Sequence, residues 1–206
     1  MRGLFSPDNP VIRFLAKLGY IWILNFLWLV TSLPIFTIGA STTALIYSCM
    51  KLHGEEGYLV KNYFHSFREN FRQATMIWLI YAGIGALLVL DLWFWKRQGG
   101  SGAKLVWAGS IAVGIFYVIS LLYVFAIQSK FVNSVKDTIH FSLILPYRHW
   151  KETILMLVVI AAVVWFNVNT IFLVNFLTIN FGIAGIAYLF SVYYINIFRR
   201  YIPEEE

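Results

Sequence analysis

The 206-residue sequence contains little charge and almost no cysteine. Asp, Glu, Lys and Arg together make up 13% of it, whereas 60% is hydrophobic, and the mean hydropathy is +0.72. Soluble globular domains carry about 25% charged residues, so this composition excludes that class of protein. The single cysteine, Cys49, excludes an intramolecular disulfide and any zinc site built from several cysteines.

Motifs that would carry catalysis or bind a cofactor are also absent. The four histidines form no His-Glu-x-x-His motif and no pair backed by carboxylates, so no metal site is predicted. There is no Gly-x-Ser-x-Gly elbow, no glycine-rich phosphate loop, and no Ser/His or Asp/Asp pair within an apolar run. The net charge of +6 comes from bases that flank apolar runs, a pattern that does not favour nucleic acid. We expect a protein that is not an enzyme and has no cofactor and no nucleic-acid partner.

Long apolar runs dominate the rest of the chain. They cover residues 18–50 (interrupted by Pro34), 74–95, 105–127, 153–175 and 178–198. A helix rises 1.5 Å per residue, so about 20 apolar residues cross the roughly 30 Å hydrocarbon layer of a membrane. Each of the last four runs therefore predicts one transmembrane helix. No small-residue cleavage site follows the first run, which we expect to remain as a signal anchor.

The whole chain, residues 1–206, is therefore predicted to form one all-α integral membrane domain. Its longest polar connections, about 51–73 and 128–152, are too short to bury a core of their own. The run 18–50 leaves two topologies open, because Pro34 disfavours helix at the residue before it. The run is either one helix followed by a surface segment or a tight hairpin of two short spans.

The distribution of Lys and Arg separates these two topologies. With a hairpin the chain crosses six times, and 13 of the 16 bases lie on one side, opposite Lys96, Arg97 and Lys104. With five crossings the split falls to 10 against 6. Short cytoplasmic loops are enriched in Lys and Arg. We predict a helical bundle of about six transmembrane helices with both termini cytoplasmic. The hairpin arms at Pro34 have about 16 residues each, so a partly re-entrant hairpin is an alternative.

The first polar connection carries an amphipathic pattern. Its apolar stripe, at helical spacing, contains Val60, Phe64, Phe67, Phe71 and Ala74. A basic stripe beside it contains Lys61, His65, Arg68 and Arg72. This pattern is typical of a cytoplasmic helix that lies in the membrane interface with its cations toward lipid phosphates. The same surface could instead bind a cytoplasmic partner. The candidate lipid or partner interface consists of Lys61, Phe64, Arg68, Phe71 and Arg72.

Polar residues within the apolar runs, the usual mark of a transport path, are few. Asp91 is the only acid inside a long run, and it lies about one turn from the tryptophans that end that run. Amides are placed in the first run and toward the end of the run 153–175, the fifth predicted span. They can bridge helices through hydrogen bonds, the favoured interpretation, or line a path for an uncharged solute. The candidate path residues are Asn25, Asn167, Asn169 and Asn175.

Three passages resemble the YesL-like family of bacterial integral membrane proteins. They are Leu33-Pro-Ile-Phe-Thr-Ile-Gly-Ala40 with Thr43-Ala-Leu45, then Tyr63-Phe-His-Ser-Phe-Arg-Glu-Asn-Phe-Arg-Gln-Ala-Thr75, then Trp78. The likeness extends over nearly the whole chain. The family has no established biochemical activity, so the resemblance transfers no functional residue. Its members are commonly encoded in Gram-positive bacteria beside carbohydrate importers and polysaccharide-degrading enzymes.

The resemblance implies an accessory role in carbohydrate import at a bacterial plasma membrane. We therefore expect a non-catalytic accessory protein associated with an ABC-type oligosaccharide importer. The expected partners are membrane lipids and the permease or nucleotide-binding subunits of the importer, and a homo-oligomer is also compatible with the sequence. The alternative is a stand-alone permease or channel for an uncharged solute such as a sugar. No ionisable residue is placed to couple solute flow to protons, which favours the accessory role.

Overall fold

The computed structural model describes residues 10–54, 58–169 and 173–201, and this part of the chain is helical and contains no strand. The elements are α1 (Pro10–Thr31), the 3-10 helix η1 (Ile35–Thr37), α2 (Ile38–His53), α3 (Leu59–Arg97), α4 (Ser101–Lys130), α5 (Val135–Arg148), α6 (Trp150–Asn169), α7 (Leu173–Leu177), the π-helix η2 (Thr178–Gly182) and α8 (Ile183–Phe198). Within the described ranges, six helical segments are long and apolar enough to cross a membrane. The prediction of an all-α, multi-pass membrane protein with six spans is confirmed.

The first two spans form a hairpin that turns at Pro34, as predicted. The Thr37 hydroxyl holds the turn by donating to the carbonyl oxygens of Thr31 at 2.5 Å and Pro34 at 2.6 Å. The first arm is longer than predicted, since α1 begins at Pro10 and has 22 residues, or about 33 Å. It includes Arg13 and Lys17, whose long side chains allow a basic residue near a helix end to reach the interface.

The first polar connection differs from the expected separate cytoplasmic helix. Residues 59–73 are the first turns of α3, which continues for 39 residues, or about 58 Å. No glycine or proline occurs between Leu59 and Ala82 to interrupt the helix. The second connection does contain a helix of its own, α5. The Ser134 hydroxyl caps its first turn by accepting the backbone N–H of Asp137 at 3.2 Å.

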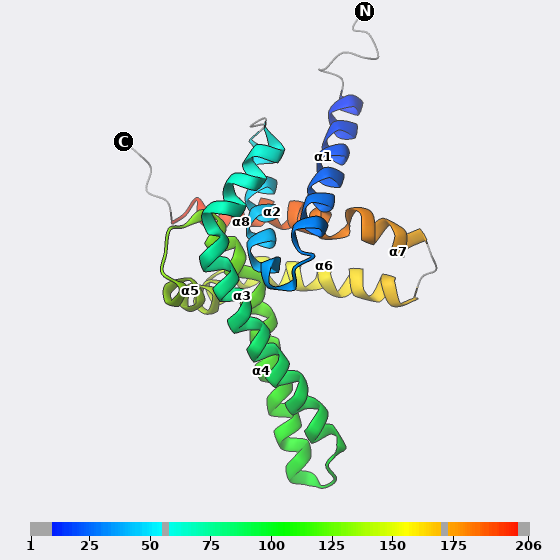
Figure 1. Ribbon diagram of the computed structural model, residues 1–206. Helices are drawn as coiled ribbons and strands as arrows, with labels where there is room; N and C mark the ends of the chain where they lie inside the picture. Colours follow the sequence, from blue (N-terminus) through cyan, green and yellow to red (C-terminus); the bar gives the residue numbers. More distant parts are fainter. Residues whose placement is uncertain (1–9, 55–57, 170–172, 202–206) are drawn as a thin grey trace, which may run out of the picture.

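The long pair of α3 and α4 extends well past the rest of the molecule (Figure 1). The most buried span is α2, which packs against α1, α3, α4 and α8. Its face toward α3 requires Gly39, because an added Cβ would lie 2.3 Å from the carbonyl oxygen of Ala74. Small residues allow this close approach of two backbones, which strengthens helix contacts in a membrane.

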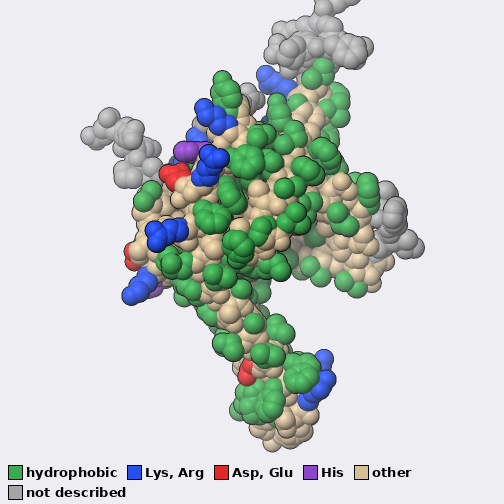
Figure 2. Space-filling view, in the orientation of Figure 1, with side chains coloured by type: hydrophobic (Ala, Val, Ile, Leu, Met, Phe, Trp, Pro, Cys, Tyr) green, Lys and Arg blue, Asp and Glu red, His purple; other side chains and the backbone are tan. Residues whose placement is uncertain are grey.

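Charged side chains gather at two ends of the molecule (Figure 2). Most of the visible bases lie around the start of α3 and α5, and a smaller group lies at the far tip of the α3–α4 pair, where Lys96 and Arg97 end α3. In Figure 1, α6, α7 and α8 run across the direction of α3 and α4. If all six spans cross one bilayer, both sets of helices must therefore tilt from its normal, as transmembrane helices commonly do.

Cysteine labelling in intact cells tests the six-span topology. On a Cys49→Ala background, single cysteines at Ser101 and Asn169 should react with an impermeant maleimide from outside. A cysteine at Lys136 should react only after the membrane is opened. Labelling of the Asn169 cysteine only from inside would contradict six crossings, because it would place α6 and α7–α8 on the cytoplasmic surface.

Candidate functional site

The five residues of the predicted interface share the exposed face of the first half of α3. We call Lys61, Phe64, Arg68, Phe71 and Arg72 the basic–aromatic surface. The side chains of Phe64 and Phe71 are 38% and 36% exposed, and the three bases are exposed as well. Two shallow hollows flank Lys61 and Phe64. One, of about 540 Å³, is closed by Tyr20 and Ile23 of α1, and the other, of about 630 Å³, by His65, Arg68 and Glu69.

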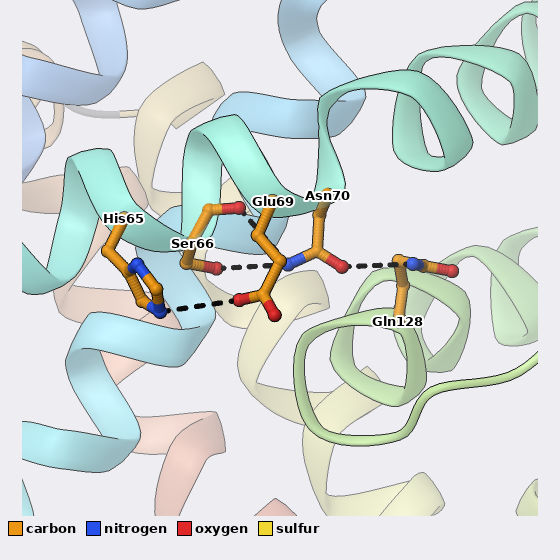
Figure 3. Close-up of polar contacts among 5 residues, drawn as sticks. All are labelled: His65, Ser66, Glu69, Asn70 and Gln128. Carbon is orange, nitrogen blue, oxygen red and sulfur yellow. Dashed lines mark hydrogen bonds and ion pairs between the residues drawn. The ribbon is translucent and has the colours of Figure 1, made fainter.

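The opposite face of the same segment is buried and largely polar. Tyr63 and Ser66 are almost fully buried, and Tyr63 bonds to the Thr31 hydroxyl at 2.7 Å. The Asn70 amide nitrogen donates to the carbonyl and hydroxyl oxygens of Ser66, at 3.1 and 3.3 Å (Figure 3). Soluble helices bury their apolar stripe and expose their polar one. Here Val60, Phe64 and Phe71 of the predicted apolar stripe are exposed, whereas Phe67 packs against the buried core and Ala74 is fully buried.

Gln128 of α4 connects this polar face to two other helices. Its side-chain nitrogen donates to the amide oxygens of Asn70 at 3.0 Å and Gln73 at 2.9 Å, both on α3. Its side-chain oxygen accepts the Thr138 hydroxyl of α5 at 3.4 Å. Gln128 is only 3% exposed, so these contacts satisfy an amide that would otherwise be buried without partners. They fix the orientation of α3 and, with it, the outward direction of the basic–aromatic surface.

A second buried cluster joins the same three helices. The hydroxyl groups of Tyr81 (α3), Ser120 (α4) and Ser142 (α5) form a closed triangle with sides of 2.5, 2.7 and 3.1 Å. Ser142 also bonds to the Ile139 carbonyl oxygen at 2.7 Å, and the Tyr117 hydroxyl donates to the Tyr81 carbonyl oxygen at 2.9 Å. The sequence did not single out these residues, because single serines and tyrosines in apolar helices carry no pattern.

The corner between α5 and α6 is built around His149 and Thr153. The Thr153 hydroxyl bonds to the carbonyl oxygens of His149 and Pro146 and to the Tyr123 hydroxyl, at 2.9, 3.2 and 2.7 Å. His149 Nε2 lies 3.1 Å from the Tyr201 hydroxyl. Burial lowers the pKa of His149, and the positive charges of Arg200 and Arg148 lower it further, against the opposing effect of Glu152.

The structure places a serine beside a histidine where the sequence showed no such pair. His53 of α2 lies with Nε2 2.9 Å from the Ser191 hydroxyl of α8, and its ring stacks on Tyr188 at 4.2 Å. Ser191 also bonds to the Tyr188 carbonyl oxygen at 2.6 Å, and His53 Nε2 lies 3.3 Å from the same oxygen. The pair links α2 to α8, and its members are 138 residues apart, which hides it from sequence analysis.

Asn25 lies at the irregular part of the last span. Its side-chain nitrogen donates to the Ile179 carbonyl oxygen at 2.8 Å, and its oxygen accepts the Ala184 backbone N–H at 3.2 Å. The Ile179 carbonyl belongs to the π-helix η2, where the regular backbone pairing of an α-helix is shifted, and the Ala184 N–H belongs to the first turn of α8. Asn25 is 1% exposed and bridges α1 to η2 and α8. This is the geometry of an interhelical bridge.

The other candidate path residues lie on different elements. Asn167 and Asn169 are near the end of α6, and each donates to a carbonyl oxygen of its own helix, that of Val163 or Trp165, at 2.8 Å. Asn175 belongs to α7 rather than to the end of the fifth span. Among the described residues, no hydrogen bond joins any two of Asn25, Asn167, Asn169 and Asn175.

Asp91 lies near the far tip of the α3–α4 pair, where its carboxylate is held by hydrogen bonds. It accepts hydrogen bonds from the Trp95 indole at 3.1 Å and from the Ser110 hydroxyl of α4. The Arg97 guanidinium lies 3.9 Å from the centre of the Trp93 ring. The Ser110 bond joins the ends of α3 and α4, whereas the contacts with Trp95 and between Arg97 and Trp93 lie within α3. In the described ranges, no group of three or more His, Cys, Asp or Glu is placed to hold a metal ion.

Comparison with known proteins gives one match. Residues 21–92 match a family model described as a protein of unknown function, DUF624, the family that includes YesL-like proteins. The matched region runs from within α1 to near the end of α3 and contains all three passages that resemble the YesL-like family. The match stops there, so the resemblance over the rest of the chain stays a prediction. No curated protein and no solved structure matches the chain.

Replacement of Asn25 by leucine tests its role as a bridge. Asn25→Leu keeps the number and branching of the side-chain heavy atoms but removes the partners of the Ile179 carbonyl and the Ala184 N–H, and should lower the free energy of unfolding by about 1–2 kcal/mol. Asn169→Leu is the matched control, because Asn169 is exposed and bonds only within α6. It should change the free energy by less than about 0.5 kcal/mol. Equal thermal midpoints for the two variants in detergent would exclude the bridging role.

Proposed function

We propose that this multi-pass membrane protein is a non-catalytic accessory subunit that binds a cytoplasmic partner through the basic–aromatic surface of α3. The observation that supports the proposal is that residues 59–73 bury polar side chains and expose aromatic ones. Asn70 and Gln73 are held by hydrogen bonds from Gln128 of α4, while Phe64 and Phe71 are partly exposed beside three exposed bases. Exposed aromatic groups next to arginines are typical of protein interfaces.

The length of α3 supports a location outside the hydrocarbon layer. Its apolar part, residues 74–95, is sufficient to cross the membrane, so the preceding 15 residues continue about 22 Å beyond it. The excess of Lys and Arg on the same side supports a cytoplasmic location for this end and for both termini. Arg72 and Phe71 lie nearest the headgroups, whereas Lys61 and Phe64 lie farther out, within reach of a soluble domain or a cytoplasmic loop.

The resemblance to the YesL-like family supports the identity of the partner. In this proposal the protein sits in a bacterial plasma membrane and binds an ABC-type oligosaccharide importer, through its permease or its nucleotide-binding subunit. The three bases of the surface require an acidic patch on that partner, since complementary charge sets specificity and the rate of association. In this proposal the importer itself carries out the transport.

Co-purification with the importer subunits encoded beside it tests the proposal. The tagged wild-type protein should retain them, and the double variant Arg68→Glu, Arg72→Glu should reduce their recovery by at least about tenfold, because two attractive contacts become repulsive. The matched control is Lys130→Glu, Lys136→Glu. It makes the same change of charge at two exposed positions outside α3, on the side of the membrane that carries most of the bases, and it should leave recovery unchanged.

Two outcomes would contradict the proposal. Equal losses in the two double variants would mean that total charge or membrane insertion, rather than this surface, sets the association. Alternatively, purified protein in liposomes could pass a labelled monosaccharide or oligosaccharide without any partner. In that case the stand-alone permease, with Asn167 and Asn169 as the first residues to change, would replace the accessory role.

A further inference from the structure

A cleft with apolar walls and a basic rim lies where α4, α5 and α8 end. It encloses about 430 Å³, within the range of about 300–1,000 Å³ typical of small-molecule sites. Ile127 and Phe131 line it from α4, and Ile144 and Leu145 from α5. Its floor is formed by Phe131 and Phe198, whose rings meet edge to face at 5.1 Å. Arg148 closes one side.

Positive charge converges on this cleft from two distant parts of the chain. Arg148 ends α5, and Arg200 follows α8. Both arginines are exposed, and Arg200 directly precedes Tyr201, which lines the cleft together with Arg148. Glu152 is the acidic group that faces this corner from α6. A guanidinium binds the oxygens of a phosphate through two parallel hydrogen bonds.

Beside the cleft, the second half of α5 exposes mainly apolar side chains. The first half of α5 exposes Lys136, Asp137 and His140, whereas its second half exposes Phe141, Leu143, Ile144 and Tyr147. The cleft lies along this second half of α5, because Phe141, Ile144 and Arg148 all line it.

We propose that this cleft binds one anionic phospholipid of the inner leaflet. An acyl chain occupies the space between Phe131, Ile144 and Phe198, and the phosphate bonds to Arg148 and Arg200. Basic pockets between transmembrane helices on the cytoplasmic side recognise anionic headgroups in this way. The site is separate from the basic–aromatic surface of α3 and does not depend on the proposed function.

Native mass spectrometry of the full-length protein tests the site. The delipidated protein is incubated with phosphatidylglycerol or with phosphatidylcholine of identical acyl chains, and retained lipid is counted per chain. Wild type should retain one phosphatidylglycerol with at least about tenfold preference, since each base near the headgroup contributes to the attraction. Arg148→Gln, Arg200→Gln should abolish the preference. Ile144→Trp, which fills the cleft from a partly exposed position, should abolish retention of either lipid.

The control variant Lys96→Gln, Arg97→Gln removes two bases from the opposite end of the molecule and should behave as wild type. Glycerol phosphate added in excess separates the headgroup from the whole lipid, and it should not displace the bound phospholipid. Equal retention of the two lipids, equal loss in the control variant, or displacement by glycerol phosphate would overturn the proposal. So would Ile144→Trp with unchanged retention, which would place the lipid outside the cleft.

Discussion

Hydrogen bonds between helices determine the arrangement of α3, α4 and α5. In hydrocarbon, apolar side chains gain little by leaving lipid for another helix, so van der Waals packing and polar contacts must hold the spans together. The hydroxyl triangle of Tyr81, Ser120 and Ser142 and the amide contacts of Gln128 each join all three helices. Because α5 is tied to both clusters, the second connection is part of the folded domain rather than a free loop.

This constraint explains why the first half of α3 carries its aromatic groups outward. Ser66, Asn70 and Gln73 are already bonded to their own helix, to Gln128 or to the start of the α5 region. Their positions leave Phe64 and Phe71 on the opposite side of the helix. A change of one polar contact would therefore alter the surface offered to a partner, although the contact itself is buried. The fold and the proposed function are coupled through the rotation of one helix.

The sequence was sufficient for the coarse fold. Apolar length predicted the spans, and Pro34 with the Lys and Arg distribution predicted the hairpin. It did not predict that residues 59–73 continue α3, because basic residues interrupt the apolar run without breaking the helix. It also missed contacts between residues far apart in the chain, such as His53 with Ser191. The sequence also grouped the amides as one set of candidate path residues. In the structure Asn25 bridges two helices, while Asn167 and Asn169 bond within α6.

The rotation of α3 is the central claim, and cysteine accessibility along residues 61–72 in native membranes measures it most directly. On a Cys49→Ala background, cysteines at Phe64, Arg68 and Phe71 should react rapidly with a water-soluble maleimide. Cysteines at Ser66 and Asn70 should react slowly, because Ser66 is buried and Asn70 is bonded to Gln128 of α4. The opposite pattern, with Ser66 and Asn70 reactive and the phenylalanine positions protected, would contradict both the buried polar network and the outward orientation of the basic–aromatic surface.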